Sequence, residues 1–199
     1  MTNTLTLIDI DETLFFTKAN IRVLSKSTGN LVRTLTNQQY NTYEHNDNEE
    51  LDFSEFIDTD IFVKTSTPNK PMIKVLQELF ETSKTSNSEV YLLTARQDFD
   101  DKDKFLEFLV KHGIEAGHKD DQKVHVIRAG NIPGLDNAGK KYHIVKKLLE
   151  GNSQFKTVQL YDDAVSNLDA FQELKLDYPE MIVKSYLINH GTIEEFKVA

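Results

Sequence analysis

Two aspartates, Asp9 and Asp11, stand at the end of a short apolar run and are spaced so that they could act together. Side chains two positions apart on an extended backbone point to the same side, so both carboxylates face one spot while Ile10 packs away. Because close carboxylates repel, they need a cation or a shared proton, and an all-oxygen site suits Mg²⁺. One carboxylate could then attack phosphorus while the other transfers protons. The alternative is that both acids only end a strand and cap the next turn.

The stretch Asp9-Ile10-Asp11-Glu12-Thr13 resembles the first motif of the haloacid dehalogenase superfamily, an Asp-x-Asp-x-Thr sequence after an apolar strand. Its Glu-Thr ending is similar to the Asp-Leu-Asp-Glu-Thr form of some phosphatases in that superfamily. The resemblance implies a Mg²⁺-dependent phosphomonoester hydrolase that forms an aspartyl phosphate on Asp9. It also implies that Asp11 donates the proton and that its main-chain carbonyl joins the Asp9 carboxylate as a metal ligand.

A second segment, Val90–Leu93 followed by Thr94, is similar to the superfamily's second motif, a strand that ends in Thr or Ser. Thr94 would donate a hydrogen bond to a phosphoryl oxygen, and Ala95 and Arg96 would also lie at the substrate. Two plainer interpretations remain. Thr94 could simply cap the turn after the strand, and Arg96 could form a surface ion pair.

The third motif is a lysine near the start of a helix, which neutralises the attacking carboxylate and the transferring phosphoryl group. Lys140 and Lys141 are the candidates. Lys141 fits better because Val145 and Leu148 follow it at the apolar spacing of the superfamily, and Lys140 then falls at the substrate. For either residue, a solvated lysine on a helix surface is the alternative.

The stretch from Thr157 to Asn167 resembles the fourth motif, in which another strand ends in paired acids. The resemblance implies that Asp162 binds Mg²⁺ directly, with Asp163 behind it or in its place. Asn167 stands where many relatives have an aspartate, so its contact with the metal shell is left open. Both acids are also well placed to cap the following helix.

The elements that would position these residues alternate between strand and helix, which predicts an α/β fold with a doubly wound, Rossmann-like parallel sheet. Continuous apolar runs are typical of strands buried on both faces. The expected strands are Thr4–Ile8, Val90–Leu93, Val124–Ile127, Val158–Tyr161 and Ile182–Ile188. Helical spacing of apolar residues indicates helices over 73–80, 105–109, 142–149 and 165–174.

Residues 17–66 interrupt this alternation and are expected to form a small cap or flap over the sheet edge, within a single domain of residues 1–199. Ile21–Leu24 and Leu31–Leu35 flank a turn and predict a β-hairpin. Thr36-Asn37-Gln38-Gln39 resembles a capping box. Glu44–Asp52 has the composition of a solvated loop. So short a segment is not expected to hold a core of its own.

The aromatic residues of and around this segment have two expected roles. Packing against the main core is the expected role of Phe15, Phe16, Phe53, Phe56 and Phe62. Tyr40 and Tyr43 could stack on a base, with simple packing as the alternative.

The composition narrows the possible functions further. No cysteine is present, which excludes disulfides, thiolate metal sites and a cysteine nucleophile. The formal net charge of −9 disfavours nucleic acid as a partner, since binding to phosphates needs clustered cations. The sequence has no apolar run of membrane-spanning length and no secretory signal pattern, so we expect no membrane partner and a cytoplasmic location.

Three functions are compatible with these patterns. The first is hydrolysis of a small phosphorylated metabolite or a nucleotide. The second is a nucleic-acid end phosphatase, for which Lys140, Lys141, Lys146 and Lys147 offer one local basic cluster. The third is a non-catalytic phospho-binding module such as a receiver domain. A receiver would need an acid after its third strand, where Ile127-Arg128-Ala129-Gly130 stands instead.

Overall fold

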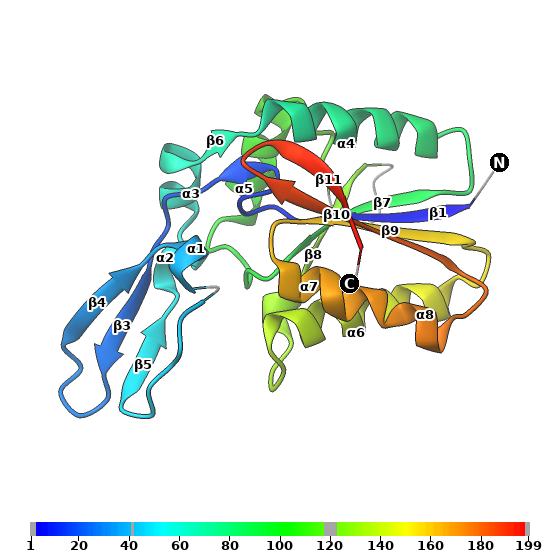
Figure 1. The fold of residues 1–199 in the computed structure, drawn as a ribbon. Coiled ribbons are helices and arrows are strands. Elements are labelled where there is room, and N and C mark those ends of the chain that lie inside the picture. Colours follow the sequence, from blue (N-terminus) through cyan, green and yellow to red (C-terminus); the bar gives the residue numbers. More distant parts are fainter. Residues whose placement is uncertain (1–2, 41, 118–122, 198–199) are drawn as a thin grey trace.

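A computed structural model describes residues 3–40, 42–117 and 123–197 of the chain, and its centre is a six-stranded sheet (Figure 1). The strand order is β11-β10-β9-β1-β7-β8. Its strands are β1 (Thr4–Ile8), β7 (Glu89–Thr94), β8 (His125–Arg128), β9 (Thr157–Asp162), β10 (Ile182–Asn189) and β11 (Thr192–Phe196). Every neighbouring pair is parallel except β10 and β11, which form an antiparallel hairpin at one edge.

Helices cover both faces of this sheet, as Figure 1 shows, and the predicted α/β class is therefore confirmed. Helices α4 and α5 share one apolar cluster with the sheet, and α6, α7 and α8 share the other. The helices are α4 (Lys70–Ser83), α5 (Lys102–Lys111), α6 (Asn137–Gly151), α7 (Val165–Gln172) and α8 (Leu174–Asp177), and a 3-10 turn, η1, spans Ala129–Asn131. None of the helices in the described ranges is both long and apolar enough to cross a bilayer.

The two clusters explain the apolar residues of β1 and of the turn that follows it. Leu5 and Leu7 pack with α6 and α7 on one face, while Ile8 and Ile10 pack with α4 and α5 on the other. Alternate side chains of a strand point to opposite faces, so a strand covered on both sides has buried residues at successive positions. The aspartates that follow β1 therefore leave a strand that is buried from Leu5 to Ile8.

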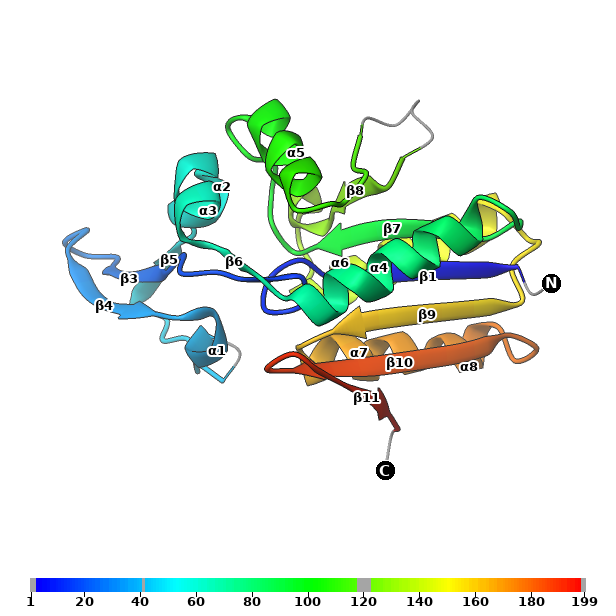
Figure 2. The ribbon, with the colours of Figure 1, turned by 90° about the horizontal axis from the view of Figure 1, so that it is seen from above.

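The insertion, residues 17–66, lies beyond the carboxyl ends of the parallel strands (Figure 2). It contains a three-stranded antiparallel sheet of β3 (Ile21–Ser25), β4 (Leu31–Leu35) and β5 (Glu49–Asp52), with the short helices α1 (Asn37–Tyr40), α2 (Ser54–Ile57) and α3 (Thr59–Thr65). The chain enters and leaves it through β2 (Phe15–Phe16) and β6 (Thr67–Pro68), which pair with each other.

Two local predictions for the insertion are confirmed. The hairpin forms between β3 and β4, and Gly29 in its turn adopts a φ of 69°, which favours glycine. The capping box also forms. The Gln39 N–H donates to the Thr36 hydroxyl at 3.2 Å, and the Thr36 N–H donates to the Gln39 side-chain oxygen at 2.9 Å.

Some expectations were wrong. Part of the supposed loop Glu44–Asp52 is strand β5, because β3 offers it a hydrogen-bonding partner that the local sequence does not reveal. The helix expected over 165–174 ends at Gln172, and a separate turn begins at Leu174. The insertion also has a small apolar cluster of its own, which contains Ala19, Ile21, Val23, Leu35 and Phe56.

Candidate active site

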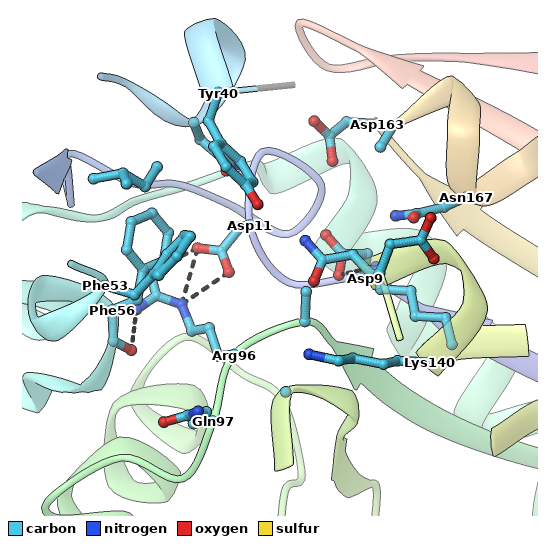
Figure 3. Close-up of a pocket in the computed structure, with 18 of the residues that line it drawn as sticks. Asp9, Asp11, Tyr40, Phe53, Phe56, Arg96, Gln97, Lys140, Asp163 and Asn167 are labelled. Atoms are coloured by element: carbon cyan, nitrogen blue, oxygen red, sulfur yellow. Dashed lines mark hydrogen bonds and ion pairs between the residues drawn. The ribbon is translucent and has the colours of Figure 1, made fainter. Parts of the chain in front are cut away.

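A cavity of about 290 Å³ lies between the carboxyl end of the sheet and the insertion. Most residues that the sequence nominated line it, and Figure 3 shows their arrangement. The sheet side contributes Asp9, Asp11, Ala95, Arg96, Lys140, Lys141 and Asp163. The insertion contributes Ile21, Asn37, Tyr40, Phe53, Phe56 and Ile57. Parallel strands expose their carboxyl ends at one edge, and ligands of open α/β sheets bind there.

Lys141 connects the carboxyl ends of the neighbouring strands β1 and β9. Its ammonium donates to Asp9 Oδ1 and to Asp162 Oδ2, each at 2.7 Å, and all three side chains are buried. Burial alone would lower the pKa of Lys141, but the charges of Asp162 and Asp9 outweigh it and raise the pKa above its ordinary value. The lysine therefore stays charged, and the preference for Lys141 over Lys140 agrees with this geometry.

Asp9, Asp162 and Asp163 form a group that could hold a metal ion. One carboxylate oxygen of each lies within 4.8 Å of the others. Burial raises the pKa of Asp9 to about 7, and Asp162 and Asp11 raise it while Lys141 opposes. Burial also raises the pKa of Asp163 to about 9, with Asp162 and Asp9 adding to the effect. One lysine thus leaves the negative charge of this group incompletely balanced, and an oxygen-ligated divalent cation fits that requirement.

Asp162, the last residue of β9, and Asp163, which follows it, differ in how many hydrogen bonds they accept. Asp162 is fully buried, and its Oδ1 accepts hydrogen bonds from the Ala164 N–H at 3.0 Å and the Asn167 amide at 2.9 Å. Asp163 lines the cavity and accepts no hydrogen bond from any described residue. Asn167 therefore orients Asp162, and the unengaged carboxylate at the cavity belongs to Asp163.

Asp11 forms a buried ion pair with Arg96. The Arg96 Nε donates to Asp11 Oδ2 at 2.8 Å and Nη2 donates to Oδ1 at 2.7 Å (Figure 3). The guanidinium also donates to the Phe56 carbonyl at 2.7 Å and to the Thr17 hydroxyl at 3.3 Å. Arg96 is 3% exposed, so the surface ion pair considered from the sequence is wrong. Arg96 instead ties Asp11 to the insertion.

The remaining nominated residues take different positions. Thr94 is completely buried and does not line the cavity, and its hydroxyl accepts the Arg96 N–H at 3.1 Å. Ala95 does line it. Lys140 faces the cavity, and its ammonium forms no ion pair with any described residue. Gly130 packs closely against the backbone of Ala95 and Arg96. A Cβ at position 130 would lie 2.3 Å from the Ala95 carbonyl oxygen.

No protein-family model matches this sequence, and no curated protein matches it significantly. The superfamily resemblance therefore rests on the motifs and on the site geometry alone.

Several polar residues of the cavity carry no motif that would reveal a site role in the sequence. Asn37 lies inside the capping box, Gln97 follows Arg96, and Asn137 begins α6. None of them stands in a strand-end acid motif, and a single asparagine or glutamine is usually a surface residue. Only the folded chain brings them to one cavity.

Proposed function

We propose that this protein is a Mg²⁺-dependent phosphomonoester hydrolase of the haloacid dehalogenase type. The observation that carries the proposal is the Lys141 ammonium, held at 2.7 Å from both Asp9 and Asp162 at the carboxyl edge of a parallel sheet. A buried lysine between two strand-end carboxylates, with Asp163 beside them, supplies both a nucleophile and the positive charge that a phosphoryl group needs.

The nucleophile in this proposal is Asp9. Its Oδ1 is held by Lys141, and its Oδ2 accepts no hydrogen bond from the described residues, so Oδ2 is available to attack phosphorus. The new P–O bond forms as the bond from phosphorus to the leaving oxygen breaks. Asp11, which must first have taken up a proton from water, gives that proton to the leaving oxygen. Asp11 then takes a proton from water as the water oxygen attacks phosphorus. The bond to Asp9 breaks, and phosphate is released.

The group of three carboxylates fits Mg²⁺. Asp9 and Asp163 would supply direct ligands, because Asp162 is already engaged by Lys141, Asn167 and the Ala164 N–H. The superfamily resemblance adds the Asp11 main-chain carbonyl. The bound ion would polarise the phosphoryl oxygens and balance the carboxylate charges. This arrangement exchanges the roles that the motif alone suggested for Asp162 and Asp163.

Arg96 acts in this scheme as a positioning residue. It supplies three N–H···O contacts to Asp11, so the carboxylate keeps about one of its four lone-pair sites for the substrate or water. Because the same guanidinium binds the Phe56 carbonyl, the insertion, acting as a cap, fixes the direction in which Asp11 transfers its proton.

The geometry gives less support to a nucleic-acid end phosphatase. The four lysines that could form a basic cluster do not act together. Lys141 points into the carboxylate group, and Lys146 pairs with Asp177 at 2.6 Å. A continuous basic track beside the cavity is therefore not formed by these residues.

Hydrolysis of p-nitrophenyl phosphate tests the proposal. We expect activity with Mg²⁺, loss of activity in EDTA, and recovery when Mg²⁺ is added back. Asp9→Asn should lower kcat by about 10⁴-fold or more, since removal of a covalent nucleophile has effects of that order. The matched control is Asp169→Asn, an exposed aspartate on α7, which should keep wild-type activity. Full activity in Asp9→Asn would exclude the aspartyl-phosphate route.

A further inference from the structure

The insertion side of the cavity is aromatic, in contrast to the charged sheet side. Tyr40 and Phe53 meet edge to face with ring centroids 5.4 Å apart, and Phe53 and Phe56 meet at 6.3 Å. In the view of Figure 3 these rings and Asp9 lie on opposite sides of Asp11. A substrate whose phosphoryl group is at Asp9 would therefore extend its leaving group past Asp11 toward the rings.

Phe53 is open to a ligand. It is 38% exposed although it is a large apolar ring, and it lines the cavity rather than packing into the main core. Phe56, by contrast, is buried beneath the Arg96 guanidinium, which lies 4.5 Å from the ring centroid. An exposed aromatic ring inside a pocket, supported from behind by a buried one, is a surface on which a flat ring can stack.

Polar groups without hydrogen-bond partners line the same cavity as these rings. The side-chain amides of Asn37, Gln97 and Asn137 line the cavity, and none of them makes a hydrogen bond within the described ranges. The Tyr40 hydroxyl is similarly without a partner among the described residues. Amides and hydroxyls both donate and accept, so together they can match the mixed donors and acceptors at the edge of a heterocycle.

Size and charge restrict what can enter. At about 290 Å³ the cavity is at the small end of ligand sites, so it has room for a ligand the size of one small molecule. On the sheet side of the cavity, the Lys140 ammonium forms no ion pair with any described residue. The cavity thus combines a phosphoryl site, one further cation and a flat aromatic platform edged by amides.

We propose that the substrate is a phosphomonoester whose leaving group carries a heteroaromatic ring. This is a nucleoside monophosphate, and its base lies against Phe53. This inference rests on the proposed function, because it takes Asp9 as the place of the phosphoryl group. Phe53 and Tyr40 supply the platform, and the amides of Asn37, Gln97 and Asn137 face the edge of the base.

The test compares kcat/KM for the four common ribonucleoside 5′-monophosphates with kcat/KM for ribose 5-phosphate, which has the same phosphorylated sugar without a base. We expect at least one nucleotide to be favoured by about tenfold or more, as base stacking on an aromatic ring would give. Phe53→Ala should remove most of that preference and leave ribose 5-phosphate within about twofold. Leu31→Ala, which changes another exposed apolar side chain of the insertion, on β4 and away from the cavity, should alter kcat/KM for neither kind of substrate.

Equal kcat/KM for all five compounds, or an equal loss for all of them in Phe53→Ala, would overturn the inference while leaving the hydrolase proposal standing. If no phosphomonoester is hydrolysed at all, the proposed function fails separately. The base preference is then decided by calorimetric titration of the Asp9→Asn variant with adenosine 5′-monophosphate, uridine 5′-monophosphate and ribose 5-phosphate. Tighter binding of a nucleotide supports the platform, and equal or absent binding rejects it.

Discussion

The two sides of the cavity differ in whether their polar side chains have partners within the protein. On the sheet side, Asp9, Lys141 and Asp162 are buried and joined by ion pairs of 2.7 Å. On the insertion side, the Asn37 amide and the Tyr40 hydroxyl are left without partners among the described residues. Groups that act on a phosphoryl group must be held in one geometry, whereas groups that recognise a leaving group must be available for new hydrogen bonds.

Arg96 connects these two sides. It binds Asp11 on the sheet side and the Phe56 carbonyl on the insertion side, and its guanidinium also packs over Phe62 at 4.8 Å. Substitutions on the sheet side should therefore reduce both stability and kcat, while those on the insertion side should act on substrate selection. The following predictions test that distinction, beginning with the largest expected effect.

Lys141→Met should have the greatest effect on the sheet side. It leaves Asp9 and Asp162 buried without their cation, which costs about 3–5 kcal/mol for a broken buried pair. The rate should fall by about 10³-fold, as when a group that stabilises transition-state charge is removed. Urea unfolding and kcat are the measurements. Lys140→Met is the matched control and should keep wild-type stability with at most about a tenfold rise in KM. Equal effects of the two variants would contradict the assignment.

Arg96→Lys tests the connection between the two sides. A lysine keeps the charge but cannot make the forked contact with Asp11 and also reach the Phe56 carbonyl. We expect kcat to fall on the order of 10²-fold through misplacement of Asp11, with a loss of about 2–3 kcal/mol in unfolding free energy.

Arg128→Lys is the control for Arg96→Lys. Arg128 is also largely buried and lies over Phe99 and Phe105, but it pairs with Asp98. Its replacement should lower stability without lowering kcat. A similar loss of kcat in both variants would show that Arg96 acts only through stability.

The stability of the metal-free protein should fall as pH rises, and Mg²⁺ should counteract this loss. The pKa values of Asp9, about 7, and Asp163, about 9, exceed the ordinary value of 3.8. Between about pH 4 and pH 9 the unfolded chain therefore binds fewer protons than the folded metal-free protein, and stability falls as pH rises. Mg²⁺ binds the ionised carboxylates, so it should add about 2.7 kcal/mol at 100 times its Kd, mainly at high pH.

Thermal melts with EDTA or Mg²⁺ at about pH 5.5 and about pH 8.5 measure this. The rise in Tm caused by Mg²⁺ should be larger at the higher pH, and the double variant Asp9→Asn, Asp163→Asn should lose that difference. An increase of the same size at both pH values would argue against a metal site built from these carboxylates.

The smallest effect is expected at Glu12, in the loop after Asp11. Glu12 has a φ of 56°, a left-handed conformation that costs a non-glycine residue about 1–2 kcal/mol. Its carboxylate accepts the Thr17 N–H at 3.2 Å, which offsets part of that cost. Glu12→Gly should therefore stay within about 1 kcal/mol of wild type, while Glu12→Ala should be less stable than Glu12→Gly by about 1 kcal/mol. Urea midpoints that rank alanine above glycine would contradict this.

The sequence predicted the sheet side of the site better than the insertion side. Thr4–Ile8 was placed with its full bounds, because leucine, isoleucine and the β-branched threonine all favour a buried strand. The convergence of Asp9, Lys141 and Asp162 followed from their places at strand and helix ends. Strand β5 was missed, since Glu49–Asp52 becomes a strand only by pairing with β3.

What the sequence by itself determined is the α/β pattern and the set of strand-end acids and lysines, since hydrophobic periodicity and motif spacing are local properties of the chain. Only the tertiary structure decided which of these groups form ion pairs and hydrogen bonds with one another and which face the cavity. Asp162 is held by Lys141 and Asn167 while Asp163 faces the cavity, and Arg96, in the loop after β7, binds Asp11 85 positions earlier in the sequence. Contacts between residues so distant in sequence depend on how the helices and the insertion pack around the sheet, and no local pattern encodes that packing.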